Sequence, residues 1–109
     1  MRELVKTEAV PASTSPASLA TKGAGMVCVS GQMPRDLSTG LIPADAKQQA
    51  ELSLGHCLKV LEAAGSSKDK VMIVWVYVTD LRVKPIVNAV FRDVFGATPP
   101  ARNLVAVKD

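Results

Sequence analysis

The segment that most constrains the fold is Val71–Thr79, whose sequence Val-Met-Ile-Val-Trp-Val-Tyr-Val-Thr is β-branched or aromatic at nearly every position. Such residues favour an extended backbone, and a strand that is apolar on both faces must be covered on both. Helices are expected on one face. The other face needs a further layer, for which a second subunit is the candidate.

Two amphipathic helices are predicted, one on each side of this run in the sequence. Residues 44–64 carry apolar side chains at spacings of three and four, with Asp45 in the first turn and Gly65 just past the end. The second helix begins near Pro85, a residue suited to a first helical turn, and stops at Gly96. Both helices are long enough to cover a sheet.

A further strand, Met26–Ser30, and the alternating residues 103–109 complete the order β, α, β, α, β. This order favours a mixed β-sheet with both helices packed on one face, an α+β layer whose other face needs a cover. Met26–Ser30 is apolar on both faces, so we expect both to be buried. Residues 9–23 are rich in Pro, Ser and Ala and should form an irregular segment outside the core. We therefore predict a single domain, 1–109, in which residues 1–23 are an N-terminal arm and edge segment.

The composition of the chain limits the classes of function that it can have. The 109 residues are 48% hydrophobic and 21% charged, more apolar than a solitary domain of this size needs, so we expect partners to cover some of the surface. The net charge of +3 is spread along the chain and aromatic residues are few, which disfavours nucleic acid as a main partner. Cys28 and Cys57 have no metal-ligand spacing, which indicates two small buried thiols in a reducing compartment and no metal site. No signal core or span of roughly 18 apolar residues occurs, so we expect a soluble protein of the cytoplasm or mitochondrion without membrane association.

Two features have residue types that can bind a small ligand. Ser30-Gly31-Gln32 ends the first predicted strand with a hydroxyl, a glycine backbone and an amide, although satisfying a tight turn is the alternative. Arg102 follows two prolines that stiffen its loop, so its planar guanidinium can be aimed at a carboxylate at little entropic cost. A solvated loop arginine is the alternative there.

His56 is the only imidazole in the chain and lies in a predicted helix beside Cys57. Neighbouring helical residues point about 100° apart, so these two side chains make a poor catalytic pair. No nucleophile motif surrounds them. We interpret His56 as structural and assign no catalytic residue.

Four motifs occur in the order and spacing of a known family: Val-Cys-Val-Ser-Gly-Gln at 27–32, Leu-Glu-Ala-Ala-Gly-Ser-Ser at 61–67, Val-Tyr-Val-Thr-Asp at 76–80 and Pro-Pro-Ala-Arg at 99–102. Together they resemble the RidA (YjgF/YER057c/UK114) family, also called the L-PSP endoribonuclease family. The resemblance implies a chorismate-mutase-like α+β fold that assembles as a homotrimer, with active sites in clefts between subunits.

The activity that the resemblance implies is hydrolysis of 2-aminoacrylate and related enamine or imine intermediates to a 2-oxo acid and ammonia, without a cofactor. Arg102 matches the arginine that grips the substrate carboxylate, Ser30 the serine that lines the cleft, and Gly31 the backbone there. The implied partners are a small 2-imino or 2-oxo acid and further copies of the chain. An RNA-acting endoribonuclease or translation inhibitor is the alternative that the family name carries, and a non-catalytic trimer that binds small acids is another.

Departures from the family pattern are expected to impair catalysis. Ala17 stands where the family shows a tyrosine that helps close the cleft, so binding should be weaker and less specific, and His56 replaces a usual asparagine. The family also continues past the position of Asp109 with a Leu-Pro turn and a strand bearing the glutamate credited with orienting the hydrolytic water. An incomplete sequence, a strand supplied by a partner, and a family member that only binds are three open explanations.

Overall fold

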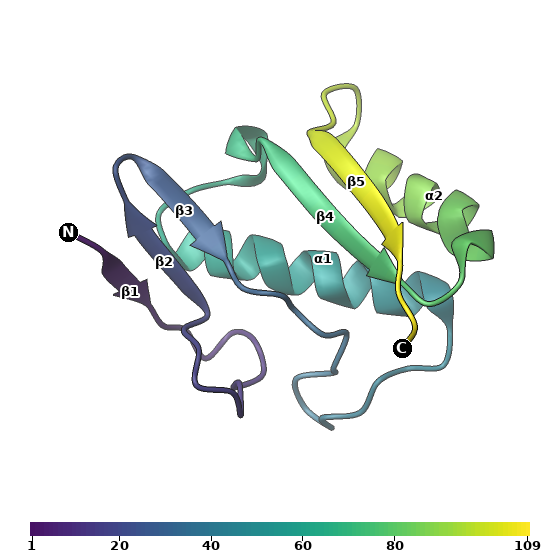
Figure 1. The fold of residues 1–109 in the computed structure, drawn as a ribbon, viewed down its shortest axis with the longest axis horizontal. Helices are drawn as coiled ribbons and strands as arrows, with labels where there is room; N and C mark the ends of the chain where they lie inside the picture. The colour runs from purple at the N-terminus through teal and green to yellow at the C-terminus, as the bar shows by residue number, and fades with distance from the viewer. The chain divides into compact units, whose positions relative to one another are not determined.

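The computed structural model describes residues 1–109 and contains five strands and two α-helices (Figure 1). The elements are β1 (Glu3–Val5), β2 (Ala20–Gly23), β3 (Met26–Val29), α1 (Ala46–Ala63), β4 (Ile73–Val78), α2 (Lys84–Phe95) and β5 (Ala101–Ala106). Short 3₁₀ turns at Lys68–Lys70 and Leu81–Val83 flank β4. The predicted α+β class is confirmed. The chain divides into a first unit, Met1–Ser67, and a second unit, Lys68–Asp109, each with one sheet.

The sheet of the first unit is antiparallel in the order β1-β2-β3. Residues 24 and 25 connect β2 to β3, and both adopt positive φ angles, 52° at Ala24 and 77° at Gly25. Two consecutive residues of that kind form the tight turn that matches the twist of a hairpin. Helix α1 covers one face of this sheet. The buried core there consists of Val5, Val10, Ala20, Val60 and Ala64, with Leu19, Val27 and Val29 packed against it.

The N-terminal segment lies closer to the core than the sequence suggested. The prediction that residues 9–23 stay outside the core is wrong, because Val10 is 3% exposed and Ala20 is 1% exposed. Ala20 begins β2, which pairs on both sides and is therefore the central strand of its sheet. The composition rich in Pro, Ser and Ala that predicted an arm belongs to the irregular stretch between Val10 and Ala20. Within the 1–23 region, only β1 is an edge strand.

Helix α1 begins and ends at the predicted signals. The side chain of Asp45 accepts a hydrogen bond from the N–H of Gln48 over 3.1 Å, so Asp45 is the N-cap rather than a first-turn residue. Gly65 follows the helix with φ of 86°, the left-handed conformation that terminates helices. The carbonyl of Ala64 accepts from Nζ of Lys22 over 2.8 Å, which satisfies one of the free carbonyls at this end.

The second unit is a β-α-β arrangement. Strands β4 and β5 run parallel, with Val74 opposite Arg102, and α2 connects them. Pro85 occupies the first turn of α2 and Gly96, at φ of 62°, ends it, as predicted. The buried face of α2 carries two branched and two aromatic residues, Val87, Val90, Phe91 and Phe95.

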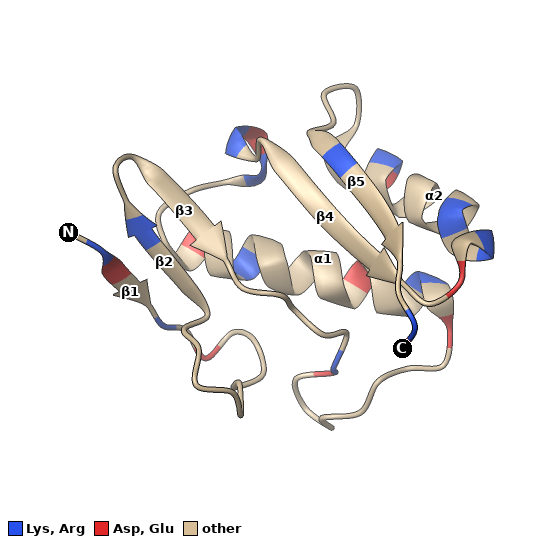
Figure 2. Cartoon of the chain, viewed as in Figure 1, with Lys and Arg blue, Asp and Glu red and all other residues tan.

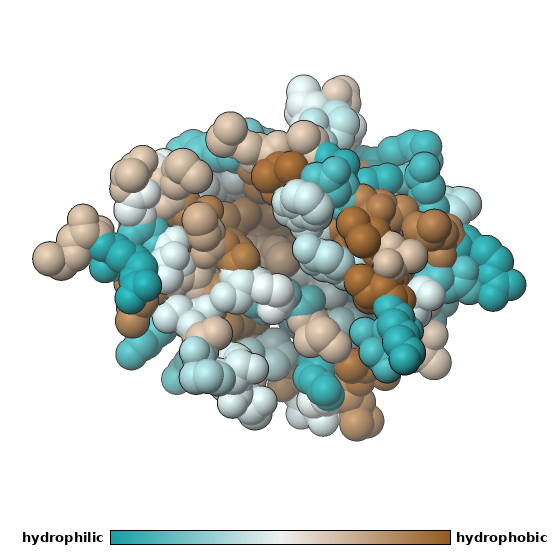
Figure 3. All heavy atoms as spheres, viewed as in Figure 1, coloured by the Kyte–Doolittle hydropathy of each residue, from teal (hydrophilic) through white to brown (hydrophobic).

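The expectation that the central strands are buried on both faces does not hold within a single chain. In β4 the side chains of Ile73, Trp75 and Tyr77 are 49%, 55% and 63% exposed, while the alternate residues are half-buried. In β3 the same alternation exposes Met26 and Cys28. Hydrophobic atoms accordingly reach the surface in Figure 3. One face of each sheet is therefore apolar and uncovered by the chain itself.

Neither α-helix combines the length and apolar character that crossing a membrane requires.

Candidate functional site

Ser30 follows β3 directly, and its polar groups are engaged by the segment that leads into β2. Its N–H donates to the carbonyl of Leu19 over 2.9 Å, and its hydroxyl donates to the carbonyl of Ser18 over 2.6 Å. The carbonyl of Ser30 accepts from Nε2 of Gln32 over 3.2 Å. Ser30 is thus fixed at three atoms, and both of its hydrogen-bond donors are used within the chain.

An open depression of about 420 Å³ adjoins Ser30 on the first unit. Its lining comes from β1, from the irregular segment before β2 and from the end of β3, and includes Leu4, Ala17, Ser18, Cys28 and Ser30. Ala17 contributes only a methyl group to this lining. The lining is polar and apolar in about equal parts, and Arg2 and Thr21 belong to it beside the oriented hydroxyl of Ser30. A mixed lining of this kind offers polar groups that can orient a small molecule.

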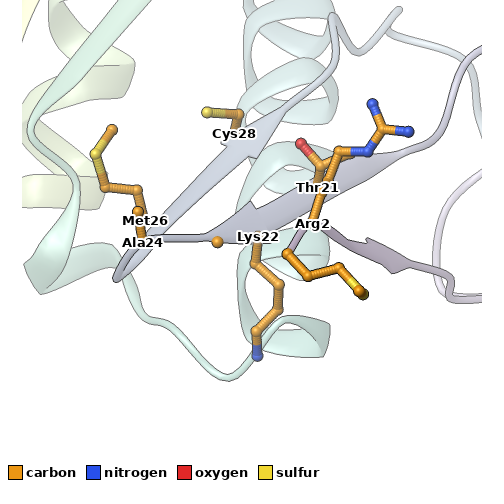
Figure 4. Close-up of a pocket in the computed structure, with 8 residues that line it drawn as sticks. Arg2, Thr21, Lys22, Ala24, Met26 and Cys28 are labelled. Atoms are coloured by element: carbon orange, nitrogen blue, oxygen red, sulfur yellow. The ribbon is translucent and has the colours of Figure 1, made fainter.

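A second depression of about 350 Å³ lies near the β2–β3 turn (Figure 4). Met26 and Cys28 project into it from β3, and Arg2 and Thr21 also line it. The Lys22 side chain extends in the opposite direction, as its bond to the end of α1 requires. None of the predicted site residues Ser30, Gly31 and Arg102 lines this depression.

The loop at 31–43 that begins with Gly31 is anchored on α1. Three side chains on one face of the helix donate to loop carbonyls: Gln49 to Pro43 over 2.7 Å, Ser53 to Gln32 over 2.9 Å and His56 to Arg35 over 2.7 Å. Their spacing of four and three residues aligns them along the helix. A carbonyl only accepts, so Nε2 of His56 carries the proton. His56 is 2% exposed, which agrees with its interpretation as structural.

Gly31, the residue after Ser30, is under no steric constraint within the chain. A Cβ placed on it would meet no atom within 4 Å, and its φ is not in the left-handed region. The glycine is therefore not required by the folding of the single chain.

Arg102 lies in β5 and is held by α2. Its Nη2 donates to Oδ1 of Asn88 over 2.7 Å, and its Cζ lies 4.8 Å from the centroid of the Phe91 ring. The side chain is half-buried, so the alternative of a freely solvated loop arginine does not describe it. A guanidinium has five N–H donors, and only one of them is used by this hydrogen bond. Arg102 is consequently oriented by the protein and still able to bind an anion in a bidentate manner.

The surroundings of several side chains shift their pKa values, among them those of Cys57 and Asp36. Burial raises the pKa of the Cys57 thiol, which makes Cys57 a weak nucleophile. The pKa of Asp36 is lowered, first by the hydroxyl of Ser38 and then by the N–H groups of Thr39 and Ser38. Asp36 lies in the loop at 31–43, where these bonds fold residues 36–39 into a tight turn.

Charged side chains do not form a metal centre. No group of three or more His, Cys, Asp or Glu residues is arranged to hold a metal ion. Lysines and arginines are scattered over strands, helices and loops of both units (Figure 2).

The structure keeps Ser30 and Gly31 adjacent in the first unit and places Arg102 in the second. Sequence reasoning missed the groups that orient them. Ser18 left no signal, because its contribution is a main-chain carbonyl. Asn88 and Phe91 did leave a signal in the sequence, because a polar residue and an aromatic residue three positions later lie on the same face of a helix.

Residues 7–109 match the protein family described as Endoribonuclease L-PSP. The 2-iminobutanoate/2-iminopropanoate deaminase of Escherichia coli is 36% identical over 98% of this chain and 86% of its own length. The crystal structure of RidA from Psychrobacter sp. is 32% identical and superimposes with a TM-score of 0.92 over 97% of this chain and 86% of that one. The structure of Escherichia coli TdcF with bound serine is 35% identical, with a TM-score of 0.90 over 97% and 86% of the two chains.

These matches cover nearly the whole chain. They agree with the family resemblance that the four sequence motifs indicated. The chain therefore belongs to the Endoribonuclease L-PSP family, the family of RidA.

Proposed function

We propose that this protein hydrolyses enamine and imine intermediates of the 2-aminoacrylate type to 2-oxo acids and ammonia. The observation that carries the proposal is the 36% identity, over 98% of the chain, to a relative named for deamination of 2-iminobutanoate and 2-iminopropanoate. The oriented guanidinium of Arg102 supports it, because every substrate of this class carries a carboxylate.

In the proposed reaction Arg102 binds the carboxylate, and Ser30 and Gly31 line the cleft that receives the rest of the molecule. The enamine tautomerises to the imine, water adds to the C=N carbon, and the resulting carbinolamine expels ammonia to leave a C=O group. The reaction needs a bound substrate, a positioned water and proton transfers. We assign no residue as the acid or base.

We propose that turnover is lower than in relatives with an aromatic ring at position 17. Ala17 lines the depression beside Ser30 with a methyl group only, so this side of it is open to solvent. A less enclosed ligand keeps more of its hydration and more of its motion, which weakens both binding and the positioning of water. Ala17→Tyr should therefore raise the rate, and an unchanged or lower rate would count against this view.

We also propose that the chain assembles as a homotrimer with ligand clefts between subunits. The support is the apolar character of the uncovered sheet faces, on which Trp75 and Tyr77 are more than half exposed. Removing aromatic side chains of this size from water is strongly favourable, which favours association of these faces with other subunits. Sedimentation equilibrium tests the assembly, and a monomer at micromolar concentration would refute it.

An RNA-acting role is the second candidate, and the family description favours it. RNA binding by dispersed lysines and arginines should weaken steeply as salt increases. Salt-insensitive or undetectable binding of a single-stranded RNA would exclude this role. A trimer that binds small acids without turnover is the remaining candidate, and the hydrolysis assay separates it from the deaminase.

The decisive experiment is calorimetric titration of 2-oxobutyrate, followed by an assay of ammonia release from enzymatically generated 2-aminoacrylate. Arg102→Ala should abolish binding in the calorimeter. Arg82→Ala is the matched control, because Arg82 lies in the same unit but pairs with Asp80 on the surface. Undiminished affinity of the Arg102→Ala variant would overturn the assignment of the carboxylate site. Binding without ammonia release would favour the non-catalytic alternative.

A further inference from the structure

We propose that the Ser30 hydroxyl faces its ligand only as a hydrogen-bond acceptor, and so selects the N–H group of the substrate over the oxygen of the 2-oxo acid product. This inference rests on the proposed function, because it names which end of that substrate Ser30 recognises. What is new is the hydrogen-bonding role of Ser30, not the place of the site.

The side chain of Ser30 has a single hydroxyl proton. The distance of 2.6 Å between its Oγ and the carbonyl oxygen of Ser18 is a hydrogen bond, and a carbonyl oxygen has no proton to give. The proton must therefore come from Ser30 and point at Ser18. The Ser30 side chain can therefore interact with a ligand only through the two lone pairs of Oγ, which accept hydrogen bonds.

The segment that receives this proton is well fixed. Leu19, the next residue after Ser18, packs against the core of the first unit and accepts a second hydrogen bond, from the N–H of Ser30. Ala20 follows in the central strand and is 1% exposed. Rotating the hydroxyl towards a ligand would thus leave the Ser18 carbonyl without its partner, at the cost of one hydrogen bond.

The same geometry argues against a nucleophilic role for Ser30. A serine becomes a nucleophile when a neighbouring base removes its proton, and a peptide carbonyl does not accept a proton in that sense. No imidazole can assist, because His56 donates its own Nε2 proton to the carbonyl of Arg35. Ser30 therefore acts through binding.

An acceptor at this position separates substrate from product. The enamine, the imine and the protonated imine all carry N–H groups, which can donate to Oγ of Ser30. A 2-oxo acid near neutral pH carries only acceptor oxygens, so its keto oxygen would meet the lone pairs of Oγ and be repelled. Hydrolysis replaces the C=N bond with C=O, and ammonia takes the N–H groups away. The site then loses its hydrogen bond to the organic product, which favours product release.

The test compares two ligands with the same carbon skeleton, L-2-aminobutyrate, which has an ammonium group at C2, and 2-oxobutyrate, which has an oxygen there. Both are titrated into the intact protein and its variants by calorimetry. Ser30→Ala should weaken binding of the amino acid about tenfold, the loss expected for a hydrogen bond to a charged donor. Binding of the oxo acid should be unchanged or tighter, because the repulsion from Oγ is removed. Ser30→Thr keeps the hydroxyl and should keep the preference. Arg102→Ala should weaken both ligands alike.

Equal weakening of both ligands by Ser30→Ala, or a larger loss for 2-oxobutyrate, would overturn the inference while leaving the proposed function in place. Binding of neither ligand by the unmodified protein would overturn the proposed function and this inference together. Should Ser30→Ala not fold, Ser30→Cys has nearly the same size and a much weaker acceptor, so the same selective loss is expected of it. An unchanged ratio of affinities in that variant would also refute the inference.

Discussion

The guanidinium of Arg102 lies over the ring of Phe91, with its Cζ 4.8 Å from the ring centroid. Stacking of this kind contributes about 0.5–2 kcal/mol, depending on how far the pair is removed from water. The hydrogen bond to Asn88 fixes the rotation of the guanidinium in its plane. Both contacts come from α2, so one helix orients the cation before a ligand arrives. A group that is already ordered loses less entropy when it binds a carboxylate.

Asn88→Asp is predicted to weaken binding of 2-oxobutyrate by at least about tenfold. The substitution keeps the size of the side chain and puts a carboxylate 2.7 Å from Nη2 of Arg102, where it competes with the carboxylate of the ligand. Asn88→Ala is the matched control, because it removes the acceptor without adding a charge, and its effect should be only a few-fold. Calorimetry distinguishes the two. A milder effect of the aspartate than of the alanine would contradict the prediction.

His56→Leu is predicted to lower the free energy of unfolding by about 1–3 kcal/mol. The substitution removes the donor that satisfies the carbonyl of Arg35 and leaves that carbonyl facing a buried side chain. Ser53→Ala removes a neighbouring bond of the same anchor and should cost about 1 kcal/mol, since Ser53 is less buried. Urea unfolding monitored by circular dichroism measures both. Full stability of His56→Leu would show that the loop at 31–43 is not anchored through this residue.

The sequence predicted those elements whose own residues strongly favour one backbone conformation. Helix α2 has Pro85 at its start and Gly96 at its end, and β4 is a continuous run of β-branched and aromatic residues. The β2–β3 hairpin was missed because its turn contains Ala24, which is seldom found at positive φ. Pairing with both neighbours, rather than local preference, places Ala20–Gly23 in a strand.

The candidate site could likewise be predicted from the sequence only in part. Arg102 and Ser30 could be selected from their residue types and motifs, but their orientation depends on contacts between segments distant in sequence. The carbonyl of Ser18 acts from twelve residues away, and its contribution does not depend on its side chain. Main-chain partners of this kind leave no residue-type signal. The polarity of Ser30 therefore becomes visible only in the folded chain.

Two glycines of the α1 region are predicted to respond oppositely to alanine. Gly65→Ala should destabilise the protein by about 1 kcal/mol or more, because φ of 86° forces Cβ against the following carbonyl. Gly55→Ala should stabilise it by up to about 1 kcal/mol, because Gly55 lies inside the helix and an added Cβ would meet no atom within 4 Å. Thermal unfolding of the pair measures the difference. A destabilising Gly55→Ala would mean that another backbone approaches α1 there.

The carboxyl of Asp36 is predicted to titrate below the ordinary pKa of aspartate, and Ser38→Ala should raise its pKa. The Ser38 hydroxyl donates to Oδ1 over 2.6 Å and is the main cause of the shift, ahead of the N–H groups of Thr39 and Ser38. A depressed pKa in the folded state means that ionised Asp36 stabilises the fold above its unfolded pKa, and that this contribution is lost as pH falls through the folded pKa. NMR titration of the carboxyl carbon measures the shift in the two proteins. Ser13→Ala is the control, since the Ser13 hydroxyl accepts from the N–H of Ser15 rather than donating to Asp36, and its loss should leave the titration unchanged. Equal pKa values of Asp36 in the unmodified protein and Ser38→Ala would show that the Ser38 hydroxyl does not hold the carboxylate.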